Sequence, residues 1–173
     1  MNDVVLPDSA FPRLYRAKSK TDRGTKSGTN TLCGPDEATE SKRVARVQIY
    51  QGTQTNETAS NEVVAYDAAV TAQRSIEHVR QLSKSCSEER QRKNGFTNLR
   101  NVGCPAELLD GAVCQRYEFT GDRGRMLHRY KVVQVRGDLY NATYADAESS
   151  QGVLAIVVPL AKKAAERTRK ARP

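Results

Sequence analysis

The residues best suited to chemistry in this chain are four cysteines, Cys33, Cys86, Cys104 and Cys114, and two histidines. The cysteines form no C-x-x-C pair and have no neighbouring histidine cluster, a pattern that favours disulfide bonds over a metal site or a redox motif. Because disulfides persist in oxidising compartments, the pattern predicts an extracytoplasmic protein. The competing interpretation is four buried free thiols in a cytosolic protein, since free cysteine packs well as a small apolar residue.

Four cysteines allow three disulfide connectivities. We favour Cys33–Cys86 with Cys104–Cys114, because each bond then closes a self-contained part of the chain. In the chain-entropy treatment these bonds would stabilise the fold by roughly 4 and roughly 3 kcal/mol, amounts that rival the net stability of a domain. Such bonds would matter in a chain with only 38% hydrophobic residues and no tryptophan.

No residue set forms a catalytic signature. The chain lacks the G-x-S-x-G nucleophile motif and a glycine-rich phosphate-binding loop. His78 falls off the apolar side of a predicted helix, which favours a solvated surface histidine. His128 alternates onto the same sheet face as Tyr130 and Val132, which favours a buried, hydrogen-bonded histidine over a ligand contact. We therefore predict no enzyme, no catalytic residues, no metal and no cofactor. Carboxylates could still act in pairs, but none stands in a context that suggests it: Glu107, Asp110, Glu118, Asp138 and Asp146.

The net charge of +8 permits attraction to nucleic acid, anionic lipid or a polyanionic cell wall. Basic residues are scattered rather than interleaved with aromatic ones, so nucleic acid is an unlikely partner. The densest basic run, 162–172, could bind anionic lipid or polymer, although basic residues commonly complement the dipole at a helix end. The chain shows neither a secretory signal nor a membrane span. If the cysteines are paired, we expect that an export signal or membrane anchor has been cut away.

The length of 173 residues predicts a single domain, with a loosely docked N-terminal arm over 1–41 and a core over 42–172. Six apolar residues between 4 and 15 could dock the arm, and the polar stretch 17–41 is typical of a long surface loop. A β-branched run at 44–50 and a second run at 62–65 predict a β-hairpin. Apolar residues at steps of three and four predict a helix over 67–84.

The second half of the chain predicts a sheet and a closing helix. Residues 96–102 look irregular or half-stranded. Three alternating segments, beginning at Val113, Met126 and Tyr140 and separated by turns at 121–124 and 136–138, predict an antiparallel meander. Helical spacing over 151–172 predicts a helix kinked at Pro159, which we prefer to a strand at 153–158 followed by a helix that starts at the proline.

In its order of parts the chain resembles the actinobacterial extracellular sensor domains found on serine/threonine kinases of the kinase-H type and on related lipoproteins. The likeness runs from about residue 4 to residue 168 and is one of pattern rather than of specific motifs. It includes a polar loop with the first cysteine, an alanine-rich helix that ends in a cysteine, and a basic closing helix. The segments that carry it are V-L-P-D at 5–8, V-V-A-Y at 63–66, Y-K-V-V at 130–133 and R-G-D-L-Y at 136–140.

The resemblance implies an α+β fold in which a twisted antiparallel β-sheet packs against two main helices and is stapled by two disulfides. It also implies a non-catalytic sensor or ligand-binding module of the cell envelope, secreted or anchored outside the membrane, whose partner is an unknown small ligand or envelope component. The alternatives are a small secreted hydrolase that uses cleft carboxylates and a basic polyanion-binding or nucleic-acid-binding module. By this resemblance the ligand cleft would be lined by Tyr117, His128, Tyr130, Tyr140 and Tyr144.

Overall fold

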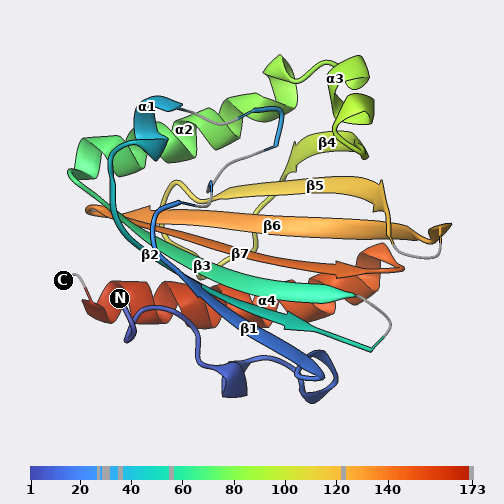
Figure 1. The fold of residues 1–173 in the computed structure, drawn as a ribbon, viewed down its shortest axis with the longest axis horizontal. Helices are drawn as coiled ribbons and strands as arrows, with labels where there is room; N and C mark the ends of the chain where they lie inside the picture. Colours follow the sequence, from blue (N-terminus) through green and yellow to red (C-terminus); the bar gives the residue numbers. More distant parts are fainter. Residues whose placement is uncertain (27, 29–31, 35–36, 55–56, 122–123, 172–173) are drawn as a thin grey trace.

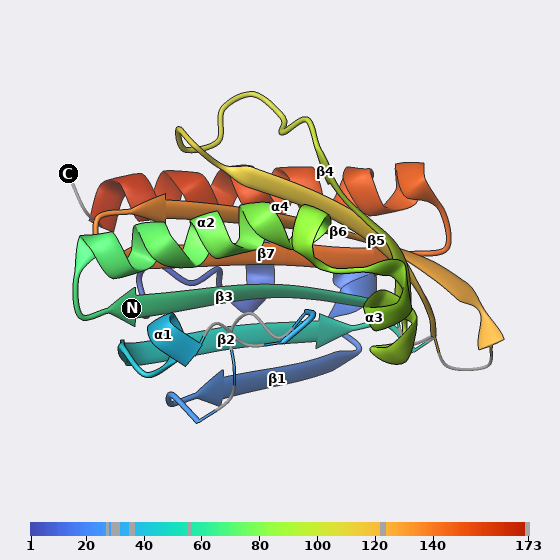
Figure 2. The same cartoon turned by 90° about the horizontal axis from the view of Figure 1, so that it is seen from above.

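A computed structural model describes residues 1–26, 28, 32–34, 37–54, 57–121 and 124–171. Within these residues the chain forms one antiparallel sheet of seven strands in the order β1-β2-β3-β7-β6-β5-β4 (Figures 1 and 2). The strands are β1 (Lys18–Arg23), β2 (Arg43–Gly52), β3 (Thr58–Tyr66), β4 (Phe96–Val102), β5 (Val113–Thr120), β6 (Met126–Arg136) and β7 (Leu139–Ala147). The predicted hairpin and meander are confirmed, although residues 122–123 of one predicted turn lie outside the described part.

Helices cover the two faces of the sheet. Figure 1 shows α2 (Ala69–Ser85) on one face and α4 (Ser150–Ala171) on the other. We call these the α2 face and the α4 face. Two short helices, α1 (Glu37–Glu40) and α3 (Glu88–Lys93), lie on the α2 side, and two 3-10 helices, η1 (Asp8–Ala10) and η2 (Arg13–Tyr15), belong to the N-terminal arm. This arrangement is the predicted α+β fold with two main helices.

The helix α2 forms where the apolar spacing predicts it. Its buried side chains recur at steps of three and four, and this stripe packs on the sheet, whereas Ala69 at its first position is exposed. The hydroxyl of Ser75 lies 2.9 Å from that of Tyr66 on β3, so a polar residue can occupy the stripe. The helix ends at Cys86, which begins the polar turn to α3. The buried residues are Ala72, Ser75, Ile76, Val79 and Leu82.

The helix α4 runs without interruption through Pro159, so the alternative of a strand at 153–158 is wrong. Proline removes the hydrogen bond to the carbonyl of Ala155. Both Pro159 and Ala155 are exposed, so water can reach that carbonyl. The opposite side of the helix packs on the sheet through a run of small and branched residues. They are Val153, Val157, Leu160, Ala161, Ala164, Ala165 and Thr168. Of the basic run, Arg172 lies outside the described residues.

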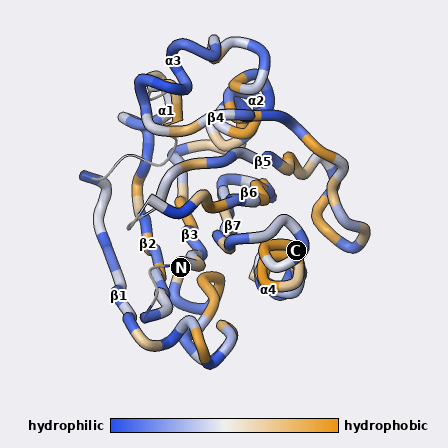
Figure 3. Tube along the Cα trace, turned by 90° about the vertical axis from the view of Figure 1, so that its right-hand side faces the viewer, coloured by the Kyte–Doolittle hydropathy of each residue, from blue (hydrophilic) through white to orange (hydrophobic). Residues whose placement is uncertain are grey.

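The largest departure from the sequence prediction is β1, an edge strand within the stretch predicted as a surface loop. Its residues are almost all exposed, so they show no apolar alternation, and only pairing with β2 makes them a strand. Charged residues on such an edge discourage pairing with another chain. Residues 88–93, which carried no apolar signal, form α3, and Ser87 caps it by accepting a hydrogen bond from the Arg90 N–H. Figure 3 shows how hydrophilic both β1 and α3 are.

The N-terminal arm contributes to the core on the α4 face. Leu6 and Phe11 are buried within the same apolar cluster as Leu160. The Leu6 N–H donates to Asn61 Oδ1 at 2.9 Å, and the Asn61 amide donates to Asn141 Oδ1 at 2.7 Å. Asn141 in turn donates to Thr168 Oγ1 on α4. A buried chain of neutral amides therefore joins the arm, two strands and the closing helix.

Two disulfides, Cys33–Cys86 and Cys104–Cys114, match the preferred connectivity and leave no free cysteine. The first closes 53 residues and ties the segment before α1 to the end of α2. The second closes 10 residues at the start of β5. Cys86 belongs to a cluster on the α2 face and Cys114 to the core on the α4 face, so each face carries one bond. The alternative of four free thiols is wrong for this structure.

Candidate ligand pocket

The five side chains predicted to line one cleft are divided between the two faces of the sheet. Glu118 pairs with His128 across β5 and β6, and Tyr117 pairs with Arg129. Because neighbouring residues of a strand point to opposite faces, this register places Tyr117 on the α2 face and His128 on the α4 face. Tyr130 shares the face of His128, whereas Tyr140 and Tyr144 share the face of Tyr117. The five therefore do not line a single surface.

Three of these side chains have structural contacts. His128 is about one-fifth exposed, and its Nδ1 lies 3.3 Å from Glu118 Oε1, so it is a paired, half-buried histidine rather than a core one. The Tyr130 hydroxyl donates to the Gly103 carbonyl at 3.0 Å. Tyr140 is fully buried and meets Tyr66 edge to face, with ring centroids 6.3 Å apart. The hydroxyl of Tyr130 and the ring of Tyr140 are therefore engaged in contacts within the protein, as is Nδ1 of His128.

Tyr117 and Tyr144 do come together, around a residue that the sequence prediction missed. The Arg129 guanidinium lies 4.5 Å from the ring centroid of Tyr144, 4.7 Å from that of Phe119 and 5.8 Å from that of Tyr117. A cation over aromatic faces is attracted by the ring quadrupoles. Burial raises the pKa of Tyr144 to about 12, although the nearby Arg129 charge opposes this. The ring therefore stays neutral at physiological pH and contacts the Arg129 guanidinium through its aromatic face.

The charge of Arg129 is balanced by Asp146, which is 1% exposed. Arg129 donates to Asp146 Oδ2 at 2.6 Å, and the Thr58 hydroxyl lies within 2.6 and 2.8 Å of the two carboxylate oxygens. Tyr15 donates to the Asp146 backbone carbonyl at 2.8 Å. The alternation of Tyr140, Ala142, Tyr144 and Asp146 in the sequence is the signal that could have found this site, because it places a carboxylate on a buried face.

A second charged group lies further along the α2 face. Arg46 donates to Glu62 Oε1 at 2.5 Å and to Asp22 Oδ2 at 2.7 Å. Burial raises the pKa of Glu62, and Arg46 opposes that rise. Burial also lowers the pKa of Lys131 to about 8, with Glu62 opposing the change. The α2 face therefore holds a row of buried charges from β2 to β6, with Arg129 and Asp146 at one end.

A cavity of about 290 Å³ opens beside the Arg129–Asp146 pair. It lies at the end of the sheet where β2 turns to β3 and β5 turns to β6 (Figure 1). Its walls combine aromatic and apolar side chains with hydroxyls, and its base holds the ion pair. The buried Nε of Arg129 has no hydrogen-bond partner among the described residues. The side chains that shape the cavity include Lys18, Tyr50, Thr53, Thr58, Phe119, Leu127, Arg129 and Asp146.

Within the described ranges no three histidine, cysteine, aspartate or glutamate side chains gather in a way that could hold a metal ion. None of the helices described is both long enough and apolar enough to cross a bilayer.

The structure was compared with known proteins. No protein-family model matches this sequence, and no curated protein matches it. Among solved structures, the extracellular domain of PknH from Mycobacterium tuberculosis is similar, with a TM-score of 0.65 and 13% sequence identity. The match covers 98% of this chain and 95% of that one. The resemblance predicted from the order of parts is thus confirmed at the level of the fold, which both chains share along nearly their whole length.

Proposed function

We propose that this protein is a non-catalytic, extracytoplasmic sensor or ligand-binding module, and that the Arg129 pocket takes its ligand. The observation that carries the proposal is the end-to-end fold match with an extracellular domain, in a chain whose four cysteines are all paired. Disulfides persist outside the cytosol, so the bonding state and the fold point to the same compartment. On this proposal the protein is held at the cell envelope, as a lipoprotein or as the outer part of a membrane protein.

The pocket chemistry favours a small polar ligand with one apolar face. Its volume of about 290 Å³ is at the low end of the range of small-molecule sites, which suits a single ring or a short chain. The aromatic walls can stack on a ring, while Arg129 can bind its polar substituents. A sugar or a small envelope fragment has this combination of groups.

The hydrolase alternative has less support. Glycoside hydrolysis needs two carboxyl groups on opposite sides of the scissile bond. Among the residues that the structure describes, Asp146 is the single acidic side chain that lines this pocket, and both of its oxygens are already bound by Thr58, with Arg129 on one of them. A carboxylate held in this way is a structural anion, so we propose that the pocket binds its ligand without cleaving it.

An NMR titration of the disulfide-bonded protein with N-acetylglucosamine, muramyl dipeptide and glycerol phosphate tests the proposal. We expect at least one probe to shift the amides of Tyr50, Thr58 and Phe119. The Lys18→Gln variant should weaken that binding, because Lys18 lines the pocket, whereas Lys20→Gln on the same strand should leave it unchanged. Turnover of a probe would contradict the non-catalytic assignment, and shifts confined to other surfaces would contradict the site.

A further inference from the structure

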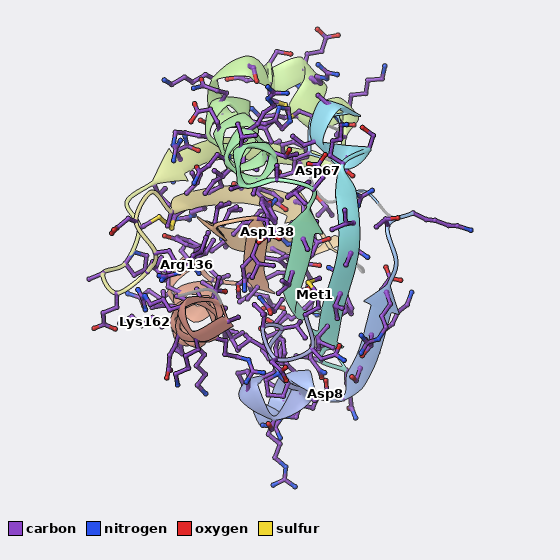
Figure 4. All side chains as sticks on the ribbon, turned by 90° about the vertical axis from the view of Figure 1, so that its left-hand side faces the viewer. Met1, Asp8, Asp67, Arg136, Asp138 and Lys162 are labelled. Carbon is purple, nitrogen blue, oxygen red and sulfur yellow. A yellow bond between two sulfur atoms is a disulfide. The ribbon has the colours of Figure 1, made fainter. Side chains whose placement is uncertain are left out.

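A second cavity lies on the α4 face, at the other end of the sheet from the Arg129 pocket. It is an open groove of about 1000 Å³ between the N-terminal arm and the last turns of α4. Figure 4 views the molecule from this end, with Met1 beside the sheet and Lys162 on α4. The residues that line it are Met1, Asp3, Val4, Leu6, Pro7, Ser9, Ala10, Ala65, Leu139, Lys163, Glu166, Arg167, Lys170 and Ala171.

The base of the groove is apolar. Val4 and Leu6 from the arm meet Ala65 at the end of β3 and Leu139 at the start of β7. All four belong to the core on the α4 face and are already buried, so the accessible apolar surface of the groove comes from Met1, Pro7, Ala10 and Ala171, which line it above them. Exposed apolar side chains that line an open groove are a surface on which an alkyl chain can be buried.

One wall of the groove is cationic. Lys163 and Arg167 stand four residues apart on α4, where like charges are neighbours and repel each other. Neither forms an ion pair with another residue in the described ranges, and the buried Nε of Arg167 has no hydrogen-bond partner there. Lys170, by contrast, is neutralised by Glu166 at 2.6 Å. Asp3 lies on the opposite wall and is exposed.

We propose that this groove binds a single-chain anionic amphiphile, an alkyl chain that carries one carboxylate or phosphate group. The head group would lie between Lys163 and Arg167, where it would relieve their repulsion. The chain would lie against Met1, Pro7 and Ala10, above the buried Leu6 and Leu139. The inference rests on the groove alone and is independent of the function proposed for the Arg129 pocket, which lies on the other face.

Calorimetric titration with dodecanoate below its micellar concentration, and with dodecanol as the uncharged probe, tests the inference on the full chain. We expect dodecanoate to bind at least about tenfold more tightly than dodecanol, since a charge-assisted pair is worth more than a factor of ten. The double variant Lys163→Gln/Arg167→Gln should lose that preference. NMR shifts should map to Leu6, Ala10 and Leu139.

The matched control is Arg74→Gln/Lys93→Gln, which removes the same charge from exposed positions on α2 and α3. It should bind dodecanoate as the unmodified protein does, and circular dichroism should show that both variants fold. Equal binding of dodecanoate and dodecanol would overturn the inference. So would unchanged dodecanoate binding by the groove variant, no binding of dodecanoate, or binding to phosphatidylglycerol vesicles alone, which would show surface adhesion instead.

Discussion

The two faces of the sheet are both buried, but they are buried by different means. The α4 face is closed by apolar side chains from α4 and the N-terminal arm, and its fully buried polar groups include the neutral amides joined from Leu6 to Thr168. The charged side chains of that face, such as Glu118 beside His128, are only partly buried. The α2 face is apolar beneath α2, where Val64, Val133 and Tyr140 form a cluster. Elsewhere on that face, the strands carry charged side chains that form ion pairs with one another. Burial alone therefore does not tell which kind of surface a strand presents.

The difference matters for the proposed function because the Arg129–Asp146 ion pair lines the proposed ligand pocket. Apolar side chains close a face by packing, whereas a buried ion pair must keep its geometry to offset the cost of desolvation. Variants on the two faces should respond differently, and the following measurements test that expectation.

The largest expected effect is loss of the Cys33–Cys86 bond, which holds the α2 face. Its closed loop is longer than that of Cys104–Cys114, so the chain-entropy treatment predicts a loss of about 4 kcal/mol for the first bond and about 3 kcal/mol for the second. Urea unfolding of Cys33→Ser/Cys86→Ser and Cys104→Ser/Cys114→Ser measures both. A greater loss for the second pair would show that the α4 face, not the α2 face, depends more on its bond.

The next largest loss of stability is expected at the Arg129–Asp146 ion pair. Asp146→Ala leaves the Arg129 guanidinium partly buried without its carboxylate. We expect this to lower the free energy of unfolding by about 3 kcal/mol. This value is at the low end of the losses seen when one partner of a buried ion pair is removed, because Arg129 is 22% exposed. Replacing both partners, as in Arg129→Met/Asp146→Ala, should restore part of that loss. Asp110→Ala at an exposed position is the control. The single variant Arg129→Met completes the comparison. If the double variant loses as much as the sum of Arg129→Met and Asp146→Ala, the two side chains are not coupled.

The sequence predicts the packed parts of both faces better than the charged part of the α2 face, for a physical reason. Apolar periodicity reports burial by packing, and it therefore located α4, α2 and the meander. It is silent where burial is achieved by ion pairs, so Arg129 and Asp146 were missed as partners. It is also silent on an exposed edge, so β1 was predicted as loop.

The predicted cleft shows a further limit. The sequence prediction places five side chains in one cleft, whereas the register puts Tyr117, Tyr140 and Tyr144 on one face of the sheet and His128 and Tyr130 on the other. Alternation fixes which residues of one strand share a face, yet the register between strands depends on the turn that joins them. The residues at 121–124 do not reveal which residues of the two flanking strands pair with each other. A shift of that pairing by one residue moves every side chain of a strand to the opposite face of the sheet.

On the apolar face the expected loss comes from a cavity. Leu160 is 2% exposed and packs within the core on the α4 face, so Leu160→Ala should cost about 2 to 3 kcal/mol. Leu154→Ala, on the exposed side of the same helix, should cost far less. Both losses should stay constant between pH 7 and 9.5, because neither substitution removes or adds an ionisable group. A pH-dependent loss at Leu160 would show that the two faces are electrostatically coupled.

The smallest expected effect is a pH dependence specific to the α2 face. Burial lowers the pKa of Lys131 to about 8 in the folded protein, below its ordinary value of 10.5 in the unfolded chain. Between these values the unfolded state binds more protons, so the free energy of unfolding should rise with pH through that window. From pH 7 to 9.5 this contribution amounts to about 2 kcal/mol.

The Lys131→Met variant should lack that rise, because it has no ammonium group to deprotonate on folding. Urea unfolding at pH 7, 8, 9 and 9.5 measures the difference between variant and unmodified protein, which should shrink as the pH increases. Lys93→Met removes an exposed lysine and should run parallel to the unmodified protein at every pH. If Lys131→Met also runs parallel, the ammonium group of Lys131 is fully stabilised by Glu62, and the charged row on the α2 face carries no desolvation cost at that position.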